Sequence, residues 1–282
     1  MEKFKLNNAQ TIPAVGFGVF LIPNNGPTYE ATLAALKAGY RHIDTAAAYM
    51  NETDVGKAIK DSGIDRNEIF ITSKLWLQDY GYENAKKGIA NSLKALDTDY
   101  IDLYLLHQPY GDYLGAWKAL EEAVAEGKIK SIGISNVTVN SWNKFKDGMT
   151  IMPVVNQVEF NPFTQQKELR KVMAENDIRL EAWYPLGHGN KDLLENEIIV
   201  SLARKYNKNA GQIILRWIYQ EGVISLPKST NLERMRGNID IFDFELTDEE
   251  MKAIEALDTG KPTHDPDNQI NEKRLMEMKI HN

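Results

Sequence analysis

Short apolar runs alternate with amphipathic helical patterns along almost the entire chain. Strands that alternate with helices form βαβ units, so this order predicts a parallel sheet with helices packed against it. Eight runs are rich in Ile, Leu, Val, Tyr and Phe, and most are bounded by turn residues, which is typical of strands. They span residues 14–18, 41–44, 69–74, 101–107, 129–135, 154–159, 178–183 and 223–227. Eight such units in one chain favour a closed (β/α)8 TIM barrel over an open sheet.

Two segments lie outside the eight units. Residues 4–6 and 11–13, on either side of Asn7-Asn8, predict a small N-terminal hairpin that covers the floor of the barrel. Near the other end, Thr247 and Glu250 have the spacing of a capping box and precede apolar residues at helical intervals, so we expect an extra C-terminal helix. The polar stretch over residues 260–282 predicts a tail that lies over one face.

The size and charge of the chain limit what it can do. A barrel of this kind takes about 250 residues, so we expect one domain over residues 1–282. The 33 Lys and Arg against 40 Asp and Glu give a net charge of −7, which argues against binding of nucleic acid or an anionic membrane. The absence of cysteine excludes disulfides and Cys-ligated metals. We see no signal peptide or membrane span, and we expect a cytoplasmic monomer.

Ionisable residues stand at the ends of three consecutive predicted strands. Asp44 ends the second strand, Lys74 the third and His107 the fourth. A single lysine or histidine at such a place is usually ordinary surface, and an aspartate often caps the next helix. Because barrel active sites lie at the carboxyl ends of the strands, three such residues together predict one catalytic mouth.

The type of these residues suggests a reaction. Tyr49 follows Asp44 closely, but a free tyrosine has a pKa of about 10, too high for efficient acid catalysis near neutrality. A nearby Lys74 ammonium would lower that pKa, and Asp44 would orient the lysine. His107 would donate a hydrogen bond to a carbonyl oxygen. This set suits protonation of an oxygen that becomes anionic, as in carbonyl reduction by hydride. No catalytic triad, metal-ligand pair or carboxylate dyad competes with it convincingly.

A second cluster predicts a phosphate site. The chain has no G-x-G-x-x-G motif, since Gly16-Phe-Gly18 lacks the third glycine and the following helix, so a Rossmann domain is not expected. Lys228, Ser229 and Arg234 instead follow the eighth strand and open a short helix, where barrels commonly bind phosphate. Two cations and a hydroxyl suit a phosphomonoester. The alternative is an ordinary helix start with solvated cations.

Seven stretches identify a family resemblance. They are DTAAAYMNETDVGKAI (44–59), ITSKLW (71–76), YIDLYLLHQPYGD (100–112), GKIKSIGISN (127–136), VVNQVEFNPF (154–163), EAWYPLGHG (181–189) and LPKSTNLERMRGNIDIFDFELTDEEM (226–251). Over nearly its full length the chain resembles the aldo-keto reductases, particularly bacterial members of the diketogluconate-reductase type. Each stretch is weak alone, but seven in this order are highly specific. The resemblance implies an NADPH-dependent oxidoreductase that reduces an aldehyde or ketone on a (β/α)8 barrel.

The resemblance also implies roles for individual residues. The catalytic group would be Asp44, Tyr49, Lys74 and His107, with Tyr49 as proton donor. The cofactor would be held by Ser135, Asn136 and Gln157 at the nicotinamide carboxamide, Trp183 on the nicotinamide ring, Leu186 and Gly187 along the pyrophosphate, Lys228, Ser229 and Arg234 at the 2′-phosphate, and Asn238 at the adenine. The substrate pocket would be lined by Phe20, Trp76 and Tyr110, under a lid formed by the tail after Lys261. For Phe20 and Trp76 the alternative is packing at the barrel mouth.

Two positions depart from the family pattern. Tyr184 stands where the family usually has a small residue near the pyrophosphate, and Gly237 stands where many members have a glutamate facing the adenine. Two other functions compete with a reductase of small carbonyl compounds. One is a non-catalytic NADP(H)-binding redox-sensing module on the same barrel, and the other is a barrel enzyme that acts on a phosphate substrate without nicotinamide. The filled catalytic positions favour the reductase.

Overall fold

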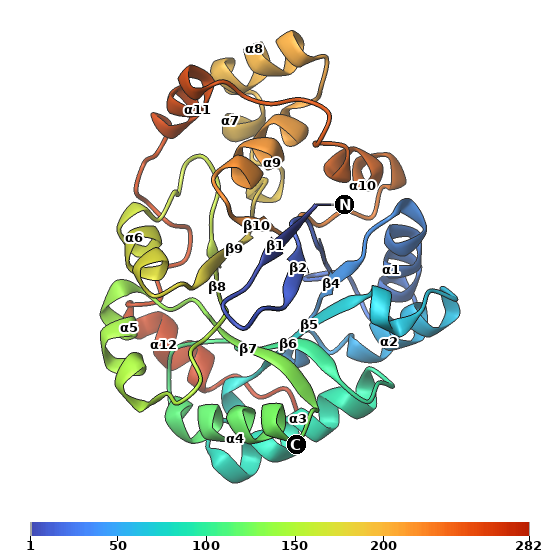
Figure 1. Cartoon of the computed structure of the whole chain (residues 1–282), viewed down its shortest axis with the longest axis vertical. Coiled ribbons are helices and arrows are strands. Elements are labelled where there is room, and N and C mark those ends of the chain that lie inside the picture. The colour runs from blue at the N-terminus through green and yellow to red at the C-terminus, as the bar shows by residue number, and fades with distance from the viewer. Residues whose placement is uncertain (1, 282) are drawn as a thin grey trace.

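The computed structural model describes residues 2–281 and contains an eight-stranded sheet whose strands pair in chain order, each parallel to its neighbours (Figure 1). The strands are β3 (Phe17–Gly18), β4 (His42–Asp44), β5 (Phe70–Leu75), β6 (Ile101–Leu106), β7 (Ile129–Ser135), β8 (Val155–Glu159), β9 (Arg179–Trp183) and β10 (Ile224–Ser225). Their positions agree with the eight predicted runs, with ends that differ by a few residues.

The sheet closes on itself between β10 and the chain that leads into β3. Val15 and Ser225 form a parallel bridge. The Gly16 N–H donates to the Ser225 carbonyl oxygen at 2.8 Å, and the Ser225 N–H donates to the Ala14 carbonyl oxygen at 3.0 Å. A third bond runs from the Gly18 N–H to the Pro227 carbonyl oxygen at 3.4 Å. The pairing at this closure is short, which is why β3 and β10 are shorter than the predicted runs. The closure confirms the (β/α)8 TIM barrel.

Helices surround the strands and cover the outside of the barrel (Figure 1). They are α1 (Pro27–Ala38), α2 (Glu52–Asp61), α3 (Tyr82–Ala95), α4 (Tyr113–Ala125), α5 (Val139–Phe145), α6 (Lys167–Glu175), α7 (Lys191–Leu194), α8 (Glu197–Tyr206), α9 (Ala210–Gln220) and α10 (Leu232–Ile239). Trp117, Trp142 and Trp217 lie on the inner faces of three of these helices and are buried. No helix within residues 2–281 has the length and apolar composition needed to cross a membrane.

The N-terminal hairpin closes one end of the barrel. Strands β1 (Lys3–Lys5) and β2 (Thr11–Pro13) pair antiparallel. Ile12 is fully buried in an apolar cluster that includes Leu103 and Val155 from the barrel strands, and the hairpin crosses the centre of the barrel in Figure 1. The predicted hairpin is therefore present at the floor, and the carboxyl ends of the strands form the open end.

The C-terminal segment contains one expected helix and one that was not predicted. Helix α11 (Asp248–Glu255) begins at Thr247, whose side chain and that of Glu250 form the predicted capping box. Helix α12 (Gln269–Met276) lies within the tail, over a stretch expected only to be polar chain. Ile270 is 78% exposed and Met276 is 48% exposed. Leu275 is the one apolar residue of α12 that packs against the core, so α12 lacks the periodic apolar pattern by which a helix is predicted. Residue 282 lies outside the described residues.

The tail is fastened to the barrel mainly through its own backbone. The Trp76 indole N–H donates to the Met278 carbonyl oxygen at 2.9 Å, and the Tyr110 hydroxyl donates to the Pro266 carbonyl oxygen at 2.6 Å. The Glu159 carboxylate, at the end of β8, accepts from the Thr263 N–H at 2.8 Å and from the His264 N–H at 3.3 Å. These bonds hold the tail across the open end of the barrel.

Candidate active site

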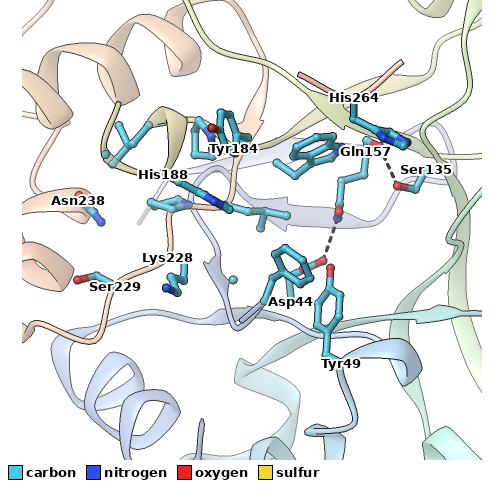
Figure 2. A pocket seen from close by; sticks show the side chains of 18 of the residues that line it. Asp44, Tyr49, Ser135, Gln157, Tyr184, His188, Lys228, Ser229, Asn238 and His264 are labelled. Carbon is cyan, nitrogen blue, oxygen red and sulfur yellow. Dashed lines mark hydrogen bonds between the residues drawn. The ribbon is translucent and has the colours of Figure 1, made fainter. Parts of the chain in front are cut away.

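The four predicted catalytic residues meet at the open end of the barrel. Asp44 ends β4, Lys74 lies near the end of β5, and His107 directly follows β6. Tyr49 comes from a short 3-10 turn, η1 (Ala47–Tyr49), which follows β4. Parallel strands place their carboxyl ends at one edge, so groups separated by dozens of residues share one mouth. Figure 2 shows Asp44 and Tyr49 directed into it.

Lys74 is the centre of a buried hydrogen-bond network. Its Nζ donates to Asp44 Oδ1 at 2.7 Å, to the Thr45 carbonyl oxygen at 2.8 Å and to Tyr49 Oη at 3.2 Å. These three bonds use all three donors of the ammonium. Burial acts to lower the pKa of Lys74, but the neighbouring Asp44 and Tyr49 outweigh it and the pKa is raised. The lysine is therefore a fully buried, permanent cation.

Tyr49 keeps its proton at neutral pH. Burial raises the pKa of Tyr49 above its usual value, although the charge of Lys74 acts to lower it. The prediction of a lowered pKa was therefore wrong in net direction, because burial of the phenol outweighs the cation beside it. Since the Lys74 ammonium donates to the phenol oxygen, the Tyr49 hydroxyl hydrogen remains available for another acceptor.

His107 is a neutral imidazole in the wall of the same mouth. Burial, followed by the charge of Lys74, holds the pKa of His107 well below its usual value. Its ring centroid lies 5.7 Å from that of Tyr49 and 5.1 Å from that of Trp76. Its Nδ1 is buried and has no hydrogen-bond partner within residues 2–281. A neutral imidazole donates from one ring nitrogen, so His107 can offer a single hydrogen bond to a ligand.

One cavity of about 1060 Å³ connects these groups with helix α10. Its volume is at the upper end of the range for small-molecule sites. Figure 2 shows Asp44, Tyr49 and Ser135 at one end and Lys228, Ser229 and Asn238 at the other. The predicted cofactor residues that line it are Ser135, Asn136, Gln157, Trp183, Leu186, Lys228, Ser229, Arg234 and Asn238. Gly187 is not among the lining residues, although its neighbours Leu186 and His188 are.

Amide and hydroxyl groups near the catalytic end are held rigidly. The Ser135 hydroxyl donates to the Gln157 carbonyl oxygen at 2.9 Å. The Asn136 side chain donates to the His107 carbonyl oxygen at 3.2 Å and accepts from the Trp183 indole at 2.9 Å. Asn136 has a φ of 59°, a left-handed conformation that asparagine adopts more readily than most residues. The polar side chains in this part of the cavity are therefore fixed by bonds within the protein.

The far end of the cavity carries unpaired positive charge. Neither Lys228 nor Arg234 forms an ion pair with any residue in the described range 2–281. Both line the cavity, together with Ser229, beside the N-terminus of α10. Two cations, a hydroxyl and a helix N-terminus match the chemistry of a phosphate group. The residues present therefore fit a phosphorylated nucleotide.

The substrate end differs from the prediction in one residue. Phe20 and Trp76 line the cavity, and the Phe20 ring centroid lies 4.9 Å from that of Tyr49. Tyr110 does not line the cavity; the structure places it beneath the tail, bonded to Pro266. The tail supplies four lining residues that were not predicted, His264, Arg274, Leu275 and Met278. No motif marks them, because long-range contacts of the tail set their position.

The two departures from the family pattern lie in or near the cavity. Tyr184 is part of its lining, and its ring centroid lies 4.4 Å from that of His188. The two rings therefore occupy space beside Leu186 that a small residue would leave open. A side chain at Gly237 would first meet the Asn209 amide, at 3.5 Å, which is an ordinary contact. Gly237 itself contributes no side chain between Arg236 and Asn238 on α10.

Glu181 is a further ionisable group near the catalytic residues and was not predicted from the sequence. It lies on β9, is fully buried, and accepts from Gln157 Nε2 at 2.7 Å. Burial, together with the charge of Asp44, raises the pKa of Glu181 to about 8. The raised pKa favours the protonated form of this carboxyl in the folded protein.

We expect Glu181 to make folding less favourable as the pH rises. Its pKa increases from 4.5 to about 8 on folding, so the protein must bury a carboxylate at high pH, and stability falls between these two values. Glu181→Gln removes this penalty. In urea unfolding, the free energy of unfolding of the variant minus that of the parent should increase by on the order of 3 kcal/mol between pH 5 and pH 8.5. A difference that stays constant with pH would contradict the raised pKa.

Comparison with known proteins gives consistent matches over the whole barrel. The model of the aldo/keto reductase family matches residues 23–259. Glyoxal reductase of Bacillus subtilis is 48% identical over 257 residues, which cover 91% of this chain and 92% of that protein. The crystal structure of the aldo-keto reductase MGS-M4, from a deep-sea metagenome library, superposes with a TM-score of 0.91 at 44% identity and covers 95% of this chain and 99% of that chain. A mutant of Gox0644, solved in complex with NADPH, gives a TM-score of 0.89 at 37% identity and covers 95% of this chain and 98% of that chain.

Proposed function

The chain belongs to the aldo/keto reductase family, and on this basis we propose that it reduces a small aldehyde or ketone to the alcohol with NADPH, with Tyr49 as the proton donor. One observation carries the proposal. The Tyr49 oxygen accepts a bond from the buried Lys74 cation at 3.2 Å, at one end of a cavity whose other end holds unpaired Lys228 and Arg234. We further propose that residues 1–282 form a single catalytic domain.

Different residues of the cavity bind different parts of the cofactor. Lys228, Ser229 and Arg234 bind the 2′-phosphate, and Asn238 contacts the adenine. Leu186 and Gly187 follow the pyrophosphate, and Trp183 stacks on the nicotinamide. Ser135, Asn136 and Gln157 bind the carboxamide. Bound in this way, NADPH supplies the hydride that reduction of a carbonyl carbon requires.

The catalytic residues supply the proton. His107 donates a hydrogen bond to the carbonyl oxygen and positions it beside Tyr49. The Tyr49 hydroxyl gives up its proton as negative charge develops on that oxygen. The Lys74 ammonium, already bonded to the phenol oxygen, stabilises the phenolate that remains, and Asp44 holds the lysine in place. The raised pKa of Tyr49 keeps the acid protonated before each turnover.

The apolar wall favours small carbonyl substrates. Phe20 and Trp76 from the barrel and Leu275 and Met278 from the tail face the same cavity and limit access of water. The name of the Bacillus relative, glyoxal reductase, supports small aldehydes and α-dicarbonyl compounds as the substrate class. The test is a panel of glyoxal, methylglyoxal, benzaldehyde and acetone, followed by loss of NADPH absorbance. If the protein binds NADPH but reduces none of them, the redox-sensing alternative is supported instead.

We expect the cofactor preference to depend on Arg234. Arg234→Ala removes a charge-assisted bond worth about 1.5–3 kcal/mol, so the Kd for NADPH should rise roughly 10- to 150-fold. The Kd for NADH, which lacks the 2′-phosphate, should change little. Arg236→Ala is the matched control, because Arg236 lies on the same helix but does not line the cavity. Equal affinity of the parent for NADPH and NADH in a fluorescence titration would refute the assignment.

A further inference from the structure

The side-chain amide of Gln157 has only one available orientation. Its Nε2 donates to Asp44 Oδ2 at 2.8 Å and to Glu181 Oε2 at 2.7 Å. An amide nitrogen carries two hydrogens, so both are used. Figure 2 shows the bond from Gln157 to Asp44. If the amide turned over, Gln157 Oε1 would face Asp44 Oδ2, and two acceptor oxygens repel each other, so the orientation in which both hydrogens are bonded is the stable one.

In this orientation, Gln157 Oε1 is the atom of the amide that is available to bind a ligand. Gln157 lines the cavity, and its Oε1 accepts no hydrogen bond from any residue in the range 2–281. A carbonyl oxygen can only accept, so this point of the cavity requires a hydrogen-bond donor on the ligand. The carboxamide of nicotinamide offers such a donor.

Asp44 alone does not fix the orientation of the Gln157 amide. Its carboxylate already accepts from the Lys74 ammonium at 2.7 Å through Oδ1, and it contributes a single acceptor to Gln157 through Oδ2. The second acceptor is Glu181, which is fully buried in the barrel interior and does not line the cavity. Without it, one Gln157 hydrogen would lack a partner and the amide could rotate.

We infer that Glu181 is a positioning residue, which acts through Gln157 to fix the acceptor oxygen that recognises the nicotinamide carboxamide. This inference rests on the proposed use of NADPH. Glu181 acts as a hydrogen-bond acceptor and not as a charge. The groups that interact with it are Asp44, Lys74, Gln157, Tyr49 and His42, and the Nε2 of His42 lies 3.8 Å from Glu181 Oε1. Burial holds the pKa of His42 at about 3, so the imidazole is neutral and provides no counter-charge.

Two substitutions at Glu181 distinguish its role as a hydrogen-bond acceptor from an effect of its charge. Glu181→Leu removes the acceptor, whereas Glu181→Gln keeps an acceptor oxygen and resembles the protonated acid. Binding is measured by calorimetry on the full-length protein, with NADPH and with adenosine 2′,5′-bisphosphate, which lacks the nicotinamide. Glu181→Leu should raise the Kd for NADPH at least about fivefold and leave the Kd for the bisphosphate within twofold. Glu181→Gln should leave both within twofold of the parent.

Other outcomes overturn the inference. If Glu181→Leu binds NADPH like the parent, or weakens both ligands equally, Glu181 does not act through the nicotinamide end. If this variant does not fold, Glu181→Asp replaces it, because the shortened side chain withdraws the carboxyl from Gln157. It should weaken NADPH binding selectively, and parental binding by a folded Glu181→Asp variant would count against the role. A parent protein that fails to bind NADPH would instead refute the proposed function.

Discussion

Replacing Tyr49 with phenylalanine should lower kcat for carbonyl reduction by about 100- to 10,000-fold and leave the Kd for NADPH within about twofold. The substitution removes only the hydroxyl, whose oxygen lies 3.2 Å from Lys74 Nζ. The aromatic ring keeps its packing against Phe20 and His107. Turnover is followed through NADPH absorbance with glyoxal as substrate, and cofactor binding through quenching of tryptophan fluorescence.

Tyr184→Phe is the control for this experiment. Tyr184 also lines the cavity, and its hydroxyl makes no hydrogen bond within residues 2–281. We expect this variant to keep parental turnover. A Tyr49→Phe protein that reduces glyoxal at the parental rate would place the acid elsewhere. The pH dependence of kcat gives a second check. Because the pKa of Tyr49 is raised, the phenol stays protonated, and its deprotonation should cause no decline in kcat for reduction between pH 6 and pH 9.

Replacing Lys74 with methionine should both inactivate and destabilise the protein. Methionine has a similar length but no charge, so Asp44 is left in the barrel without its cation. Breaking a buried ion pair by removing one partner costs about 3–5 kcal/mol of folding free energy. The loss should be larger at pH 8 than at pH 5, because the pKa of Asp44, already raised by burial, rises further and the carboxyl stays neutral at low pH.

An exposed pair provides the comparison. Lys60 and Asp97 form a salt bridge at 2.7 Å whose side chains are 71% and 64% exposed. Exposed pairs contribute about 0–1 kcal/mol, so Lys60→Met should change urea unfolding very little. If Lys74→Met costs no more than Lys60→Met, the buried network does not stabilise the barrel as we describe.

The barrel and its catalytic group were predictable because they depend on local pattern. Each strand shows its own apolar run, and each catalytic residue stands at a fixed place relative to one. Parallel pairing then brings Asp44, Lys74 and His107 together without further information. The largest differences in strand length are at the closure, in β3 and β10, since pairing there depends on two distant edges of the sheet.

Features that depend on distant contacts were not predictable. The net pKa shift of Tyr49 depends on how deeply the phenol is buried, which no short motif encodes. Tyr110 has the residue type of a pocket wall, but the tail covers it. Glu181 has charged and apolar neighbours typical of any strand, and only the curvature of the barrel brings it to Gln157.

The way the tail is attached affects which mutations this protein can accept during evolution. Most of the hydrogen bonds that hold the tail involve its main-chain atoms, as at Thr263, His264, Pro266 and Met278. The Asp267 side chain is an exception, since it accepts from the side chains of Thr138 and Asn140. Main-chain groups are the same whatever side chain they carry, except at proline, so most mutations in the tail leave the attachment intact. The side chains that reach the cavity, such as Arg274 and Leu275, can then be substituted without loss of these main-chain hydrogen bonds. New substrate preferences can therefore arise in this segment while the proton-transfer machinery below it stays unchanged.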